Sequence, residues 1–84
     1  MTQKDKLIER LRSHPKDFTF AEAQTLLGYL GFRRTNKGKT SGSRVLFVKE
    51  GSEGMFIHIP HPQKELRAYQ VKEILKRLEE EGLI

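Results

Sequence analysis

The sequence predicts an α+β fold: a three-stranded antiparallel sheet with helices packed on one face, in the order α-α-β-β-β-α. Apolar residues follow the helical period of roughly 3.6 up to Gly31, switch to a strand period of roughly 2, and return to the helical period near the C-terminus. Each amphipathic helix needs apolar surface to cover, and one face of a meandering sheet supplies it. The opposite face of the sheet is therefore expected to stay open.

The chain is expected to form a single domain over residues 1–84. Residues 1–14 are predicted to be an accessory N-terminal helix with a narrow apolar stripe, ended by Pro15. Residues 19–84 are predicted to form the core of the domain.

The second helix has a start signal and an end signal in the sequence. Thr19 and Glu22 are spaced for a capping box, in which each side chain satisfies an unpaired amide of the first turn. Gly31 can adopt the left-handed conformation that ends a helix, and Gly28 is interpreted as a place where a neighbouring element approaches closely. The apolar face between these signals consists of Ala23, Leu26, Leu27 and Leu30.

Three strands and a last helix follow. The strands are predicted within residues 32–36, 43–49 and 54–60, and the glycine-bounded segment 50–54 is read as a hairpin connection. The last helix is predicted within residues 61–84, because apolar residues recur there at helical spacing. Its apolar face consists of Ala68, Val71, Ile74, Leu75 and Leu78.

The composition favours an acidic or polyanionic partner and excludes several kinds of site. Lys and Arg number 16 against 11 Asp and Glu, and the net charge of +5 suits RNA, DNA or an acidic protein. The chain has no cysteine, which excludes disulfides and thiolate zinc sites; three histidines remain as conceivable metal ligands, but we predict no metal site. The sequence shows no signal peptide and no apolar run of membrane-spanning length, so we expect a cytoplasmic protein without membrane contact.

Strand alternation predicts which residues look out of the open face. The purely apolar set should face the helices, which places Arg44, Phe56 and His58 on the other side. Two registers are compatible with a short connection: one pairs Arg44 with His58, and the other makes them diagonal neighbours about 5–8 Å apart at Cβ. The set expected to face the helices is Val45, Phe47, Met55, Ile57 and Ile59.

This small group on the open face allows two interpretations. Arg44 and His58 can be ordinary solvated residues of a strand surface. Together with the aromatic ring of Phe56, they also supply the cationic, hydrogen-bonding and stacking groups that hold RNA.

The loop before the second strand, "NKGKTSG", contains lysines, glycines and hydroxyl residues. It is not a nucleotide-binding P-loop, because Gly38 and Gly42 are too close together and a strand follows instead of a helix. It can be a mobile charged turn, or it can grip a nucleic acid backbone. The residues that would do so are Lys37, Lys39, Ser41, Gly42 and Ser43.

Several short motifs follow one another in a fixed order along the chain. A leucine-rich helix ends in "LGF", basic residues such as Arg34 follow in the next strand, and "KG" and "GS" precede a strand with an aromatic residue. A histidine then leads into "KEL" and a last helix that ends in "EGL". The motif residues are Leu30 to Phe32, Lys37 and Gly38, Gly42 and Ser43, Phe47, His61, and Lys64 to Leu66. In their order and spacing these motifs resemble the HicA family, the small toxins of bacterial toxin–antitoxin pairs.

The resemblance implies a fold like a double-stranded RNA-binding domain, mRNA as the substrate and a HicB-like antitoxin as the protein partner. It also implies ribosome-independent mRNA cleavage without a bound cofactor, with the histidine of a Gly-Ser-His motif as the catalytic residue. Such chemistry suits histidine, which can take or give a proton near neutral pH. By the same resemblance Arg34 joins the RNA-binding set, which otherwise consists of the loop residues together with Arg44 and Phe56 of the open face.

This sequence departs from the family pattern in two ways: the residue after Gly42 and Ser43 differs, and the loop before it is longer than the usual form, with "KTSG" inserted. Arg44 stands where the family has its histidine, and arginine stays protonated, so it can bind phosphate but cannot act as a base. His58 beside it can supply the proton-transferring group, His61 can do so from the end of the third strand, or cleavage has been lost. His14, in a helix-ending turn, is set aside.

Two other functions are compatible with the charge. A non-catalytic module of the same fold could bind RNA or an antitoxin. A DNA-binding helix-turn-helix is less well supported, because the second helix, "FAEAQTLLGYL", carries no basic residue to meet phosphates or base edges.

Overall fold

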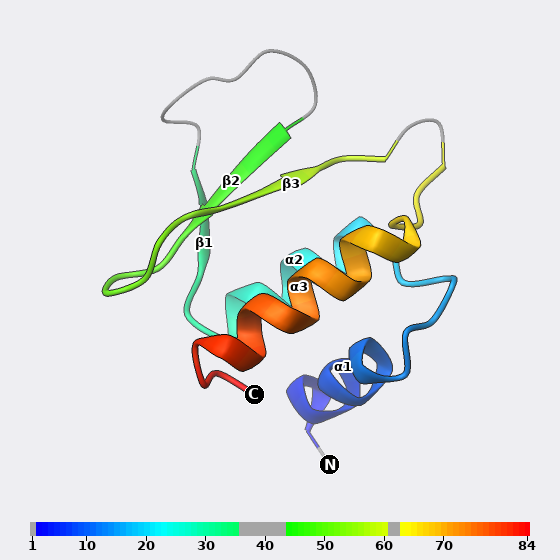
Figure 1. Cartoon of the computed structure of the whole chain (residues 1–84), viewed down its shortest axis with the longest axis horizontal. Coiled ribbons are helices and arrows are strands. Elements are labelled where there is room, and N and C mark those ends of the chain that lie inside the picture. Colours follow the sequence, from blue (N-terminus) through cyan, green and yellow to red (C-terminus); the bar gives the residue numbers. More distant parts are fainter. Residues whose placement is uncertain (1, 36–43, 61–62) are drawn as a thin grey trace.

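The elements of the computed structural model occur in the predicted order. The structure describes residues 2–35, 44–60 and 63–84. Within these ranges a meandering sheet follows two helices and precedes a third (Figure 1). The elements are α1 (Gln3–Arg12), α2 (Phe20–Tyr29), β1 (Arg33–Thr35), β2 (Arg44–Val48), β3 (Met55–His58) and α3 (Ala68–Glu80).

The sheet is antiparallel with β2 in the middle and β1 and β3 at its edges. Of the two registers that alternation allowed, the structure has the one in which Arg44 lies opposite His58. Val45 then lies opposite Ile57, and Phe47 lies opposite Met55. Because cross-strand partners share a face of the sheet, this register places Val45, Phe47, Met55 and Ile57 on one side.

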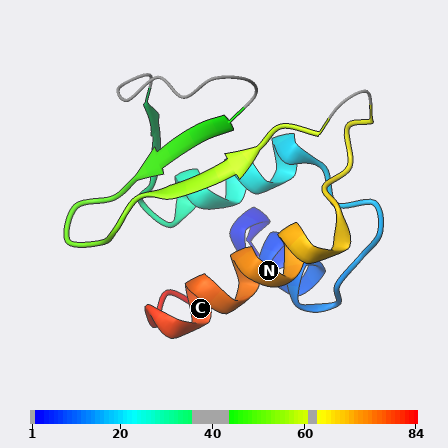
Figure 2. The same ribbon diagram turned by 45° about the horizontal axis from the view of Figure 1, so that its top comes forward.

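All three helices lie on one side of the sheet, as both ribbon views show (Figures 1 and 2). α2 and α3 lie beneath the sheet, and α1 packs against these two helices. The predicted helix-facing residues of β2 and β3 are buried, except that Ile59 is only partly buried against the core. Phe20 at the start of α2 meets Phe47 of β2 with ring centroids 6.2 Å apart. The predicted α+β architecture is therefore confirmed.

The predicted capping box starts α2 and also connects it to α1. The Glu22 amide donates to Thr19 Oγ1, and the Thr19 amide donates to the Glu22 carboxylate, each at 3.1 Å. Arg10 of α1 donates to the same carboxylate at 2.9 Å, and this hydrogen bond is the main reason that the pKa of Arg10 is raised. α1 also contributes Leu7 and Leu11 to the buried core.

α3 is attached to the β3 side of the sheet through two of its side chains. Gln70, only 6% exposed, accepts from the Arg67 amide and donates to the backbone carbonyl of His58, both at 2.9 Å. Arg77 donates to the carbonyl of Gly54 at 3.3 Å. Helical spacing predicted Ala68 on the apolar face of this helix, but this prediction is wrong, because Ala68 is exposed. The first turn of α3 therefore buries the amide of Gln70 in place of that methyl group.

Gly28 does not serve the close approach that the sequence suggested. A Cβ built on Gly28 meets nothing within 4 Å, and the residue is exposed inside α2. We therefore expect Gly28→Ala to raise the free energy of unfolding by about 0.5–1 kcal/mol, because alanine loses less backbone entropy in a helix. Urea denaturation followed by circular dichroism measures this change. Gly31→Ala is the matched control and should destabilise the protein, because Gly31 has a φ of +98°. A loss of stability in Gly28→Ala would contradict the open surroundings of that residue.

Candidate nucleic-acid interface

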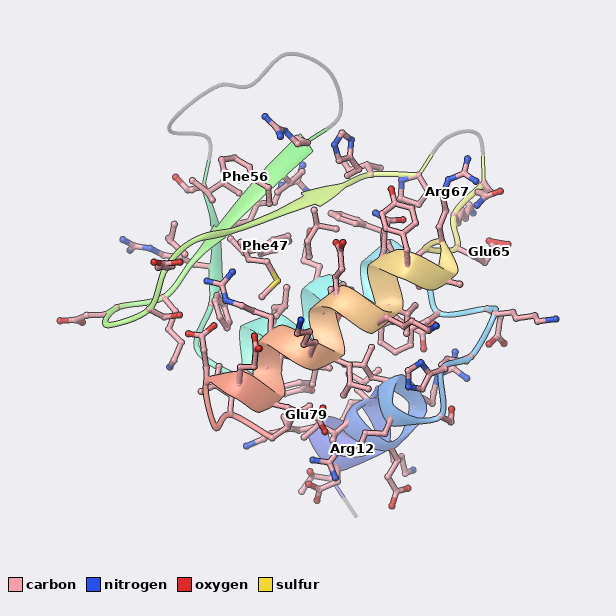
Figure 3. All side chains as sticks on the ribbon, viewed as in Figure 1. Arg12, Phe47, Phe56, Glu65, Arg67 and Glu79 are labelled. Atoms are coloured by element: carbon pink, nitrogen blue, oxygen red, sulfur yellow. The ribbon has the colours of Figure 1, made fainter. Side chains whose placement is uncertain are left out.

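The face of the sheet away from the helices carries a group of polar and aromatic side chains. Cross-strand partners share a face, so the residues that alternate with the buried ones look out on this side. In Figure 3, Phe47 lies toward the helices and Phe56 lies on the other side of the sheet. We call this side the open face; its described residues are Arg33, Thr35, Arg44, Leu46, Val48, Phe56 and His58.

Arg44, Phe56 and His58 lie together on the open face. Arg44 is directly opposite His58 in the register, and its guanidinium carbon lies 4.8 Å from the centroid of the Phe56 ring. All three residues are exposed, with Phe56 at 48% of its full accessible area. A guanidinium over a ring gains about 0.5–1 kcal/mol at an exposed site, which favours one position of the cation and leaves its N–H groups at the rim for a ligand.

The backbone that carries Arg44 and His58 is fixed by the sheet and by helix α3. Arg44 lies at the start of the central strand β2, and His58 lies at the end of the edge strand β3. The carbonyl of His58 accepts the hydrogen bond from Gln70 of α3, so the end of β3 is fixed to a helix while the imidazole belongs to the opposite, open face. The sequence predicted the Arg44 and His58 neighbourhood but missed the role of Gln70.

Arg34 lies on the other side of the sheet. It pairs with Phe47, so its side chain is on the side of the helices, and its guanidinium donates to the Gln24 side chain of α2 at 3.1 Å. The structure therefore does not bring Arg34 to the open face. Arg33, which the sequence analysis did not select, is there instead, opposite Val48. The signal was present, because strand residues alternate and the neighbouring Phe32 is buried.

The other selected residues are not part of the described open face. The loop set Lys37, Lys39, Ser41, Gly42 and Ser43, together with His61, lies outside the described residues. His14 follows α1, which Figure 1 shows on the far side of α2 and α3 from the sheet. In the part of the chain that the structure describes, no three or more His, Asp or Glu residues are grouped so as to hold a metal ion. No helix in the same ranges is long and apolar enough to cross a membrane.

Most of the chain, including every strand of the sheet, matches a known protein family. A family model described as the HicA toxin of bacterial toxin–antitoxin systems matches residues 20–79. The chain belongs to the HicA toxin family. The match begins at the first residue of α2 and includes all three strands, so the whole open face of this HicA chain lies within it, whereas α1 lies outside. No curated protein and no solved structure matches the chain significantly.

Proposed function

We propose that this HicA-family toxin binds RNA on its open face. The observation that carries the proposal is the register that pairs Arg44 with His58 and places the Arg44 guanidinium over Phe56. A cation, an aromatic ring and an imidazole on one exposed surface can contact a phosphate, a base and a ribose hydroxyl of a single strand. Arg33 adds a second cation on the other edge strand of the same face. We also propose a HicB-like antitoxin as the protein partner, because the family consists of toxins from toxin–antitoxin pairs.

Removing Arg44 should weaken RNA binding and reduce its dependence on salt. We expect Arg44→Ala to lower the affinity for a short single-stranded RNA about tenfold, which corresponds to about 1.4 kcal/mol, because a charge-assisted hydrogen bond to phosphate is lost. The slope of log K against log salt should fall by about 0.7, the value for one phosphate contact on a single strand. Fluorescence anisotropy of labelled RNA over a series of salt concentrations measures both quantities.

Arg12→Ala is the matched control for this experiment. Arg12 is exposed near the end of α1, far from the open face, and its removal costs the protein the same single charge (Figure 3). If the two variants lose equal affinity, binding depends only on net charge and the open face is not the site. Binding that is insensitive to salt would also contradict the proposal.

The second candidate function is RNA cleavage at the same face, and the pairing of His58 with Arg44 favours it. In such cleavage the ribose 2′-oxygen attacks the neighbouring phosphorus and the 5′-oxygen leaves. His58 would take the 2′-hydroxyl proton or give a proton to the leaving oxygen, while Arg44 stabilises the negative charge that develops on the phosphate oxygens. Arg44 cannot replace the imidazole, because a guanidinium does not release its proton near neutral pH. If cleavage is absent, the chain acts as an RNA- or antitoxin-binding module of the same fold.

A further inference from the structure

A groove runs between the edge strand β3 and helix α3, next to the open face. It encloses about 310 Å³. Phe56 and His58 line it from the strand, and Tyr69 lines it from the helix. Phe56 and His58 therefore belong both to the open face and to this groove, which makes the groove a direct continuation of the proposed RNA surface over the edge of the sheet.

The backbone edge of β3 is partly occupied inside this groove. At one end of β3, Gln70 of α3 donates to the carbonyl of His58; just before the other end, Arg77 of α3 donates to the carbonyls of Glu53 and Gly54. In a strand, every second residue directs its N–H and C=O to the same edge, so the amide and carbonyl of Phe56 face the groove between these two places. A peptide that joins the sheet as a further strand needs several unpaired N–H and C=O groups along the edge of β3. The carbonyls on both sides of Phe56 already accept hydrogen bonds from α3. A single planar group needs only one donor and one acceptor.

The side chains of the groove suit a neutral aromatic group more than a phosphate. Tyr69 is 54% exposed and offers a ring face for stacking. The charges that line the groove are balanced, because Glu73 and Glu80 stand against Lys76 and Arg77. Arg77 also forms an ion pair with Glu81 at 2.6 Å, and the carboxylate partly neutralises the charge that Arg77 presents to a ligand. Phosphates are thus attracted to Arg44 on the open face and not into the groove.

We propose that the groove between β3 and α3 is a subsite for one unpaired RNA base, which stacks on Tyr69 while its edge hydrogen-bonds the backbone of Phe56. Stacking of a base on an aromatic side chain is how single strands are commonly held, and a donor next to an acceptor can read the edge of a base. A base in a duplex cannot enter, because its edge is already paired. The inference rests on the proposed RNA binding and adds that the bound RNA is single-stranded beside His58.

The tyrosine content of the chain gives a direct test. The protein has two tyrosines and no tryptophan, so Tyr29→Phe leaves Tyr69 as the only tyrosine, and Tyr69→Phe leaves Tyr29. Tyr29 is exposed to a similar degree, 50%, but lies at the end of α2 and does not line the groove. A short oligoadenylate should quench the tyrosine fluorescence of Tyr29→Phe much more than that of Tyr69→Phe. The second variant also serves as the correction for light that the RNA absorbs. The same strand paired with oligouridylate should not produce this difference.

Affinity provides an independent measurement. Tyr69→Leu should lower the affinity for oligoadenylate about tenfold, whereas Tyr69→Phe, which keeps the ring, and Tyr29→Leu should bind like the unchanged protein. If anisotropy shows binding but the fluorescence of the two single-tyrosine proteins is quenched equally, no base enters the groove. That result contradicts the subsite and leaves the proposed RNA binding on the open face in place. Equal quenching by the duplex also overturns the subsite. Absence of any binding overturns the proposed function and the subsite together.

Discussion

Replacing His58 by alanine is expected to slow RNA cleavage by about 10²–10⁴-fold, the usual contribution of a side chain that transfers a proton. The reason is chemical: of the three groups that lie together on the open face, the imidazole of His58 is the one whose chemistry suits the transfer of a proton. The variant should still bind RNA, because Arg44 and the Phe56 ring remain. Its backbone should also stay in place, because Gln70 holds the carbonyl of His58 and not its ring.

The experiment follows cleavage of a labelled single-stranded RNA by gel electrophoresis, with EDTA present to exclude contaminating metal-dependent nucleases. His14→Ala is the control. His14 is exposed and follows α1, which lies on the far side of α2 and α3 from the sheet, so this variant should cleave RNA like the unchanged protein. A substrate with a 2′-deoxyribose at the cleaved position should bind without being cut, since the attacking oxygen is missing.

The outcomes separate the two proposed functions. Cleavage that survives in His58→Ala would falsify the assignment of His58, while RNA binding on the open face would remain supported by Arg44→Ala. An unchanged protein that binds RNA but does not cut it would contradict the cleavage proposal and leave the binding proposal in place. In that case the chain acts by binding alone.

Sequence alternation was enough to predict the central part of the site. The apolar residues of β2 and β3 can share a face only in certain registers, and either of the two candidates makes Arg44 and His58 neighbours. The order of the elements and the capping box of Thr19 and Glu22 could be predicted because both depend on local spacing. The family was also recognisable from short motifs in a fixed order.

Features that depend on distant contacts could not be predicted in the same way. In the sequence, Gln70 looked like an ordinary polar residue of α3. Its side-chain amide donates to the carbonyl of His58 only because this helix lies beside β3. The groove beside Tyr69 depends on the same placement. Arg34 is a different case, since alternation from the buried Phe32 places it on the side of the helices, away from the open face. Its selection rested on the family resemblance and not on the faces of β1.

Replacing Phe47 by alanine is expected to cost about 3–5 kcal/mol of folding free energy, the usual range for a buried phenylalanine. Phe47 is 1% exposed between the sheet and the helices, and its ring packs against Phe20 of α2. Small domains have about 5–15 kcal/mol in total, so this variant should be close to unfolding at room temperature. Urea denaturation followed by circular dichroism measures the loss.

Phe56→Ala is the matched control, because the same side chain is removed from the neighbouring strand on the opposite face of the sheet. It should cost less than about 1 kcal/mol, mostly from the contact with Arg44, since the ring is half exposed. Similar losses in the two variants would mean that the sheet is covered on both faces. The open face would then not be available to RNA, so this comparison tests the stability argument and the functional argument together.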